Sequence, residues 1–201
     1  MLRSQGLAVS PSSPFTPPGS ASNFLDASAL DRTLRRIAQE ILEHHPDPSS
    51  FALIGIPSRG VELATRLGSV IGELLGGAAA SLPFCGSVDV SMHRDDLHSR
   101  RLLPAIQPTR LPSSFEGKTI VLVDDVLQSG RTCRAAMDSL SSFGRPSRIE
   151  YAVLIDRGLR ELPISADYTG RRIETTLSER VFVRLLPQDK EEGVWIERRL
   201  S

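Results

Sequence analysis

The stretch that most constrains the fold begins with four branched apolar residues, Ile120-Val121-Leu122-Val123, and continues with Asp124 and Asp125. A short apolar run of this kind is typical of a strand that is buried on both faces, as in a parallel sheet. A small-residue loop follows, and the helical pattern after it ends at Gly144 and Pro146, which are helix stop signals. The stretch therefore predicts a strand, an acidic tip, a loop and a helix, which is a unit of α/β folds.

The acidic tip and the loop predict a binding site. In an open α/β sheet, ligands bind at the carboxyl ends of the strands, where Asp124 and Asp125 are expected. Adjacent carboxylates there are costly unless something binds them, and vicinal ribose hydroxyls or a divalent cation would do so. The loop over residues 128–132 offers backbone N–H groups, the hydroxyls of Ser129 and Thr132 and a positive helix end, which suit a phosphate. Ribose hydroxyls beside a phosphate describe a ribose 5-phosphate.

Other proteins also carry an apolar strand that ends in two acids, including nucleotide triphosphatases and receiver domains. The chain contains Gly117-Lys118-Thr119, but a P-loop requires a glycine where Pro112 stands. This triplet also precedes a strand instead of following one. A purely structural turn with solvated acids is the other alternative, and it is disfavoured because a buried acidic tip needs a partner.

The residues of this stretch resemble the signature that binds phosphoribosyl pyrophosphate (PRPP) in type I phosphoribosyltransferases. The resemblance implies an α/β fold with a central, mainly parallel sheet flanked by helices, a small C-terminal hood and a flexible lid loop. It also implies that the following residues bind PRPP: Asp124, Asp125, Val126, Leu127, Gln128, Ser129, Gly130, Arg131 and Thr132.

A second buried strand is predicted over residues 51–56, before Pro57-Ser58-Arg59-Gly60 and a helix over residues 61–75. A strand tip with a small hydroxyl residue, an arginine and a glycine indicates another anion site, although an ordinary helix N-terminus would look similar. In phosphoribosyltransferases this position is the pyrophosphate loop. The resemblance therefore assigns the pyrophosphate of PRPP to Ser58, Arg59 and Gly60, together with Arg94.

The chain has 201 residues with 24 basic and 24 acidic side chains, which predicts a single domain over residues 23–201. The balanced charge argues against bulk electrostatic binding to nucleic acid, but it leaves room for a local basic patch. Residues 1–22 are rich in Ser and Pro and are expected to form a disordered tail. Cys85 and Cys133 are too few for a disulfide framework, and no apolar run approaches membrane-spanning length, so a cytoplasmic protein with no membrane partner is expected.

A first helix is predicted from Asp26, which can cap it, and its polar face carries Arg32, Arg35 and Arg36. Arginines at this spacing are neighbours on a helix surface. They form either a solvated face or a patch that binds RNA.

The remaining elements are less regular. Residues 88–92 alternate like a strand. Residues 97–115 lack periodicity, which predicts either a functional lid or a disordered segment. The spacing of His93, Asp95 and Asp96 does not support a closed metal site. Downstream, a strand over residues 149–155 is predicted to end at Asp156-Arg157-Gly158. A last strand pair is predicted over residues 181–185 and 194–196.

Motifs in the second half of the chain narrow the resemblance to the PyrR family of pyrimidine-operon regulatory proteins, over residues 24–196. They are Met92-His-Arg-Asp-Asp-Leu97, Gly144-Arg-Pro146, Ala152-Val-Leu-Ile-Asp-Arg-Gly158, Arg160-Glu-Leu-Pro-Ile164 and Ala166-Asp-Tyr168. The resemblance implies a bacterial cytosolic enzyme that makes UMP and diphosphate from uracil and PRPP with Mg2+. It also implies homo-oligomers (dimers or higher forms) and binding to pyr leader mRNA when UMP or UTP is bound.

The resemblance also assigns roles to residues. Asp124 and Asp125 would hold the ribose hydroxyls and, through Mg-PRPP, the metal ion, and Arg94 would act beside them in catalysis. Backbone groups near Asp156 and Arg157 would bind the base. If the protein acts as an RNA regulator, the basic face of the first helix is the expected binding site, with Arg32, Arg35 and Arg36 as its residues.

The chain departs from the family pattern at His93, Gln128, Leu159 and Ser165. A histidine and an arginine are usual at the last two of these positions, and their loss would thin a basic surface. Two alternatives therefore stay open. One is a phosphoribosyltransferase for another base without an RNA role, and the other is an RNA-binding regulator with only residual catalysis.

Overall fold

The computed structural model describes residues 21–57, 59–77, 82–91 and 108–198. Several predicted features lie outside these ranges. They are the tail up to residue 20, the two site residues Ser58 and Arg94, the cluster of His93, Asp95 and Asp96, and the first part of the predicted lid.

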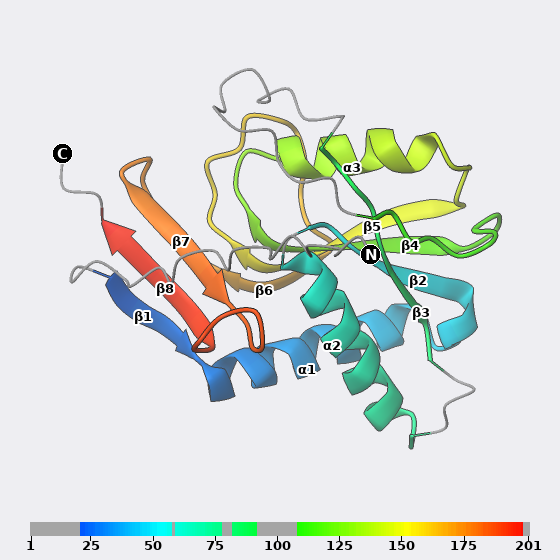
Figure 1. Cartoon of the computed structure of the whole chain (residues 1–201), viewed down its shortest axis with the longest axis horizontal. Coiled ribbons are helices and arrows are strands. Elements are labelled where there is room, and N and C mark those ends of the chain that lie inside the picture. The colour runs from blue at the N-terminus through cyan, green and yellow to red at the C-terminus, as the bar shows by residue number, and fades with distance from the viewer. Residues whose placement is uncertain (1–20, 58, 78–81, 92–107, 199–201) are drawn as a thin grey trace, which may run out of the picture.

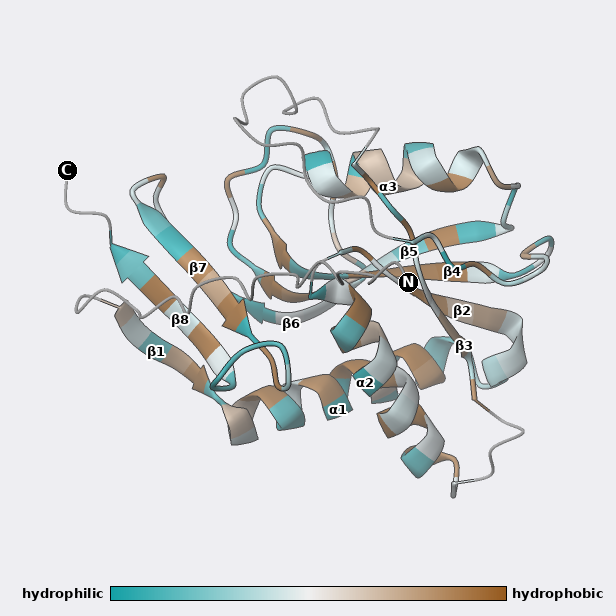
Figure 2. Ribbon diagram, viewed as in Figure 1, coloured by the Kyte–Doolittle hydropathy of each residue, from teal (hydrophilic) through white to brown (hydrophobic). Residues whose placement is uncertain are grey.

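Within the described residues, the central element is a parallel sheet of five strands in the order β3-β2-β4-β5-β6 (Figure 1). Its inner strands are apolar runs that are buried on both faces, as a parallel sheet requires, and they appear as brown ribbons in Figure 2. The strands are β2 (Phe51–Gly55), β3 (Phe84–Ser87), β4 (Thr119–Leu127), β5 (Arg148–Asp156) and β6 (Tyr168–Arg172).

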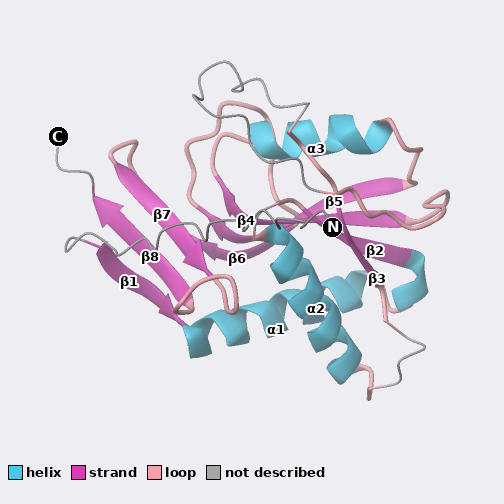
Figure 3. Ribbon diagram, in the orientation of Figure 1, coloured by secondary structure: helices cyan, strands magenta, loops and turns pink. Residues whose placement is uncertain are grey.

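The helices cover both faces of this sheet (Figure 3). Helices α1 (Ala27–His44) and α2 (Gly60–Leu74) pack on one face, α3 (Arg131–Ser141) packs on the other, and a short 3-10 helix, Pro48–Ser50, precedes β2. Asp26 caps α1 as predicted, because its carboxylate accepts a hydrogen bond of 2.7 Å from the N–H of Ala29. The fold class expected from the sequence is confirmed.

A second, antiparallel sheet forms the hood, with strands in the order β1-β8-β7. Strands β7 (Glu179–Arg184) and β8 (Gly193–Arg198) confirm the predicted C-terminal pair, but β1 (Ala21–Asp26) was not predicted. Ala21 and Ser22 pair with β8, so these two residues, which the prediction assigned to the tail, belong to a strand. The hood joins the main core through Leu25, Val183 and Val194.

The edge of the sheet also differs from the prediction. The strand lies at Phe84–Ser87, and the described part of the predicted strand, residues 88–91, is not a strand. The Asp89 carboxylate accepts hydrogen bonds from the N–H and hydroxyl of Ser91 and turns the chain there. The last part of the predicted lid is fixed on this edge. Arg110 forms an antiparallel bridge with Ser87, and Phe115 is buried in the core.

Candidate active site

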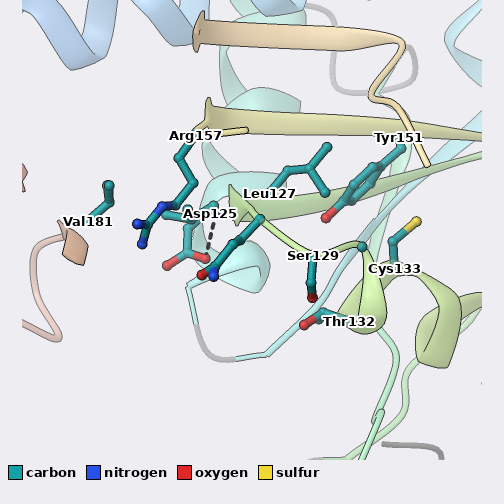
Figure 4. A pocket seen from close by; sticks show the side chains of 11 residues that line it. Asp125, Leu127, Ser129, Thr132, Cys133, Tyr151, Arg157 and Val181 are labelled. Carbon is teal, nitrogen blue, oxygen red and sulfur yellow. Dashed lines mark hydrogen bonds between the residues drawn. The ribbon is translucent and has the colours of Figure 1, made fainter. Parts of the chain in front are cut away.

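A cavity of about 290 Å³ lies where β4 ends and α3 begins (Figure 4). Its walls come from β4, the loop after it, the start of α3, β5 and the hood. The lining residues are Asp125, Val126, Leu127, Gln128, Ser129, Gly130, Thr132, Cys133, Tyr151, Arg157 and Val181. The structure therefore brings most of the predicted PRPP-binding residues together around one space.

The two acids have different surroundings. Strand β4 continues to Leu127, so both acids lie inside the strand and not after its end, which corrects the predicted acidic tip. Asp125 lines the cavity, whereas Asp124 does not and is only 5% exposed. The Tyr151 hydroxyl donates a hydrogen bond of 3.0 Å to Oδ2 of Asp124. Asp124 therefore lies behind the cavity wall that Tyr151 forms.

Both acids are held at an electrostatic cost. Burial raises the pKa of Asp124 well above its usual range, and the charge of Asp125 adds to this shift. Burial also raises the pKa of Asp125, and a hydrogen bond from the N–H of Val126 and the charge of Arg59 only partly offset it. Asp125 accepts the Val126 bond at 2.8 Å. A ligand with hydroxyl donors would lower this cost, because bonds to the carboxylate favour its charged form.

The loop after β4 turns its donors toward the cavity. The carbonyl oxygen of Ser129 accepts hydrogen bonds from the N–H groups of Glu161 and Leu162, and that of Gln128 accepts one from Arg160. The carbonyls are therefore occupied by donors from the segment after β5. Figure 4 shows the hydroxyls of Ser129 and Thr132 close together on the cavity wall.

Gly130 makes this loop possible. It is the N-cap of α3 and has a φ of 92°, in the left-handed region that favours glycine. A Cβ there would also lie 3.2 Å from Cβ of Ile164. Helix α3 starts directly after it, so the first N–H groups of the helix lie beside the cavity. Loop and helix together provide hydroxyls, N–H groups and a positive helix end, which can bind a phosphate.

Arg131 does not share this position. Its Nε donates a 2.8 Å hydrogen bond to Glu161, it is largely exposed, and it does not line the cavity. The sequence pattern could not distinguish it from its neighbours in the loop.

The second predicted anion loop lies against β4. A Cβ on Gly60 would come within 2.3 Å of the carbonyl oxygen of Val123, so only glycine allows this approach. The N–H of Ile56 donates to the same carbonyl at 2.8 Å. Arg59, at the start of α2, is paired with Asp189 of the hood. The loop thus lies beside the two acids, although Arg59 and Gly60 do not line the cavity.

The residues predicted to bind the base lie at the end of β5. Asp156 accepts hydrogen bonds from the N–H of Gly158 and pairs with Arg160 at 2.6 Å. Arg157 is only 5% exposed and lines the cavity. It donates to Thr175 and to the carbonyls of Thr176 and Glu179, and burial lowers its pKa. The Arg157 side chain therefore ties the hood to the parallel sheet.

Some functional positions were missed from the sequence. Tyr151, Cys133 and Val181 line the cavity, and Asp189 pairs with Arg59. These residues carry no local signal, because they reach the site through strand register and through the packing of the hood.

The arginines of α1 make internal contacts. Arg32 donates to the hydroxyl of Ser28, Arg35 pairs with Glu73, and Arg36 pairs with Glu40. Arg36 also donates to the carbonyls of Thr169 and Gly170 in β6. It thereby forms one wall of a groove of about 370 Å³ between α1 and β6. The groove is lined by Arg36, Glu40, Asp167, Thr169, Gly170, Arg171 and Arg172.

Comparisons with known proteins agree with this geometry. The phosphoribosyl transferase domain family matches residues 20–186. The chain is 49% identical over 174 residues to the bifunctional protein PyrR of Leifsonia xyli, covering 86% of this chain and 94% of that protein. It is 47% identical over 175 residues to the bifunctional protein PyrR of Listeria monocytogenes, covering 86% and 93%.

Solved structures with the same fold include two hypoxanthine phosphoribosyltransferases. That of Trypanosoma cruzi has a TM-score of 0.65 at 14% identity, covering 89% of this chain and 91% of that one. That of Staphylococcus aureus has a TM-score of 0.62 at 17% identity, covering 89% and 92%. At these identities the likeness concerns the fold alone.

Proposed function

Because the chain belongs to the phosphoribosyltransferase family and, within it, to the bifunctional PyrR proteins, we propose that it converts uracil and PRPP to UMP and diphosphate. We also propose that it regulates pyrimidine-biosynthesis operons by binding their leader mRNA when a uridine nucleotide is bound. A cytoplasmic location and assembly into dimers or higher forms remain predictions from the resemblance. Among the described residues, no helix is long and apolar enough to span a bilayer.

One observation carries the enzymatic proposal. A partly buried carboxylate with a raised pKa, Asp125, shares a cavity with a loop whose hydroxyls and N–H groups can bind a phosphate. Ribose hydroxyls would donate to Asp125 while the 5-phosphate binds between Ser129 and Thr132. Asp124 has a different role in this proposal, because it supports Tyr151 from behind the wall.

The chemistry is a substitution at the anomeric carbon of the ribose. Asp125 would orient the sugar and stabilise positive charge that develops on the ring, and the loop at Ser129 would fix the phosphate end. Arg59 and the N-terminus of α2 would bind the leaving diphosphate. Uracil would lie toward Arg157, whose guanidinium forms the wall beneath the hood.

The site fits a magnesium ion that arrives with PRPP. Asp125 offers a hard carboxylate oxygen at the cavity. Among the described residues, no three His, Cys, Asp or Glu side chains gather at a place that could hold a metal ion. Bound Mg2+ would neutralise the charge of the leaving diphosphate.

The test of the enzymatic proposal is Asp125→Asn, assayed for UMP formation. The variant removes the charge but keeps the shape, and we expect a loss of at least about 100-fold, as for other electrostatic groups in active sites. Asp138→Asn is the control, since Asp138 is exposed on α3 and pairs only with Arg134 in the described structure. Unchanged turnover in a folded Asp125→Asn protein would refute the assignment. A panel of uracil, orotate and hypoxanthine then identifies the base.

The groove between α1 and β6 is the best-supported RNA site. Its two exposed arginines, Arg171 and Arg172, stand beside Arg36. RNA phosphates that lie in the groove would meet the positive charge of these three side chains. The proposed RNA site therefore centres on Arg171 and Arg172 of β6 and not on Arg32 and Arg35 of α1.

The test of the RNA proposal is the double variant R171A/R172A. We expect weaker binding of leader RNA in the presence of UMP, with a salt slope smaller by about one for each lost phosphate contact. Arg145→Ala removes an exposed charge near the end of α3 and is the control. Equal RNA affinity in the double variant and the wild type would exclude the groove. A wild-type protein that never retains leader RNA would exclude the regulatory role.

A further inference from the structure

Arg59 of the pyrophosphate loop is held by a carboxylate of the hood. Its Nη2 lies 2.7 Å from Oδ1 of Asp189, and its Nε donates to Oδ2 at 3.1 Å. The side chains of Arg59 and Asp189 are only 28% and 18% exposed. This is a bidentate pair, in which one edge of the guanidinium is fully used by the carboxylate.

Asp189 is itself fixed in place. It lies in the turn between β7 and β8, where the N–H of Leu185 donates to its carboxylate at 2.8 Å. The N–H of Asp189 donates in return to the carbonyl of Leu185 at 2.9 Å. The turn thus presents a preorganised carboxylate to Arg59.

The Asp189 carboxylate occupies the edge of the Arg59 guanidinium that a phosphate would use. Guanidinium groups bind carboxylates and phosphates through the same two parallel N–H donors. The positive charge of Arg59 acts on Asp125, where it partly offsets the rise in pKa that burial causes. Arg59 therefore stands beside the proposed ribose site. A diphosphate that uses this edge of Arg59 must first displace Asp189.

We propose that Asp189 competes with the diphosphate of PRPP for Arg59 and so sets the affinity for PRPP. This inference rests on the proposed function. Asp189 acts through Arg59 and is a positioning residue that lowers the affinity for PRPP and for free diphosphate. UMP carries no diphosphate, so its affinity does not depend on this exchange.

A second ion pair would keep the hood attached to α2 while diphosphate displaces Asp189 from Arg59. Arg66, further along α2, pairs with both oxygens of Glu192 at 2.7 and 3.0 Å and donates to the carbonyl of Leu186 at 2.7 Å. These contacts anchor the same turn to α2, and neither Arg66 nor Glu192 lines the cavity. Glu192 therefore offers a matched control, since breaking its pair loosens the turn without releasing Arg59.

The experiment compares Asp189→Asn with Glu192→Gln by equilibrium binding of PRPP, diphosphate and UMP, each with Mg2+. The asparagine keeps an acceptor for the N–H of Leu185 but removes the competing charge. We expect Asp189→Asn to tighten the binding of PRPP and of diphosphate by about three- to fivefold, the upper part of the range for release of a partly exposed ion pair. UMP binding in that variant, and all three ligands in Glu192→Gln, should change by less than about twofold on the same scale.

Several results would overturn the competition. They are unchanged or weaker PRPP binding in Asp189→Asn, an equal gain for UMP, or the same gain in Glu192→Gln. Asp189→Ser is the second variant if the asparagine protein does not fold, because it also removes the carboxylate. A folded wild type that binds neither PRPP nor diphosphate would instead refute the proposed function, so the two failures are distinguishable.

Discussion

Two acidic sites lie on neighbouring strands of the sheet, and the pKa values of their carboxyl groups are shifted in opposite directions. At the start of β5, Glu150 lies 2.8 Å from Nε2 of His45 and accepts a 2.7 Å hydrogen bond from the hydroxyl of Tyr168. Burial acts to raise the pKa of Glu150, but these two bonds and the charges of His45 and Arg148 together outweigh it, so the net pKa is lowered. At the far end of β4, the pKa values of Asp124 and Asp125 are raised.

Under the proposed function, this difference separates an acid that stabilises the fold, Glu150, from an acid that would bind substrate, Asp125. Glu150 has its partners within the chain, so its charge stabilises the folded state. Asp125 has too few donors of its own, and a ligand with hydroxyl groups can supply the missing ones. A partly buried carboxylate beside a cavity, which the chain itself compensates poorly, is therefore the observation on which the proposed site rests.

The largest effect that would test this contrast is on stability at Glu150. Glu150→Ala leaves the Tyr168 hydroxyl and His45 without their shared partner in a buried place. We expect the free energy of unfolding to fall by about 2–4 kcal/mol, with kcat of the folded fraction unchanged. Urea denaturation measures the change, and Glu116→Ala, at an exposed acid, is the control. A loss below about 0.5 kcal/mol would show that Glu150 is not a structural anchor.

At the cavity, we expect substitution of the acid to stabilise the folded state, whereas substitution of Glu150 destabilises it. Asp125→Asn removes a poorly compensated, partly buried charge, so we expect it to raise the free energy of unfolding at neutral pH by about 0.5–2 kcal/mol. The pKa of Asp125 is higher in the folded state than in the unfolded state, where it is 3.8. The charge of Asp125 therefore destabilises the folded state at high pH, and this destabilisation is absent below pH 3.8, where the group is protonated in both states. The gain should therefore vanish as the pH falls below 3.8. Destabilisation at neutral pH would contradict the contrast.

The smallest effect is a pH dependence. The lowered pKa of Glu150 gives stability above its ordinary value of 4.5, and this stability is lost as the pH falls through the lower folded pKa. Glu150→Gln cannot titrate, so its unfolding free energy should fall less steeply than that of the wild type below pH 4.5. We expect a difference of about 1 kcal/mol, the size of a net side-chain hydrogen bond. If the unfolding free energies of the wild type and Glu150→Gln changed equally with pH, the charge of Glu150 would not stabilise the folded state.

Local patterns in the sequence were sufficient to predict the parallel sheet and the glycine-containing loop between β4 and α3. The apolar run before Asp124 and the glycine at position 130 are read directly from the chain, because burial and turn geometry act on neighbouring residues. The edge strand was placed too late, since the turn at Asp89 depends on its own side chain bonding to Ser91.

The parts that were missed depend on contacts between distant segments. Strand β1 exists because β8 pairs with it from the other end of the chain. Asp124 and Asp125 are equivalent in the sequence, and only the register that places Tyr151 beside β4 gives them different surroundings. Asp189 reaches Arg59 only after the hood has formed.

The most direct test of the central claim is calorimetric titration of Mg-PRPP into the wild type, Asp125→Asn and Glu150→Gln. If Asp125 is the acid that holds the ribose, the wild type and Glu150→Gln should bind PRPP alike. Asp125→Asn should then bind at least about tenfold more weakly, as expected for the loss of hydrogen bonds to a charged group. Equal PRPP binding by Asp125→Asn and the wild type would contradict the account.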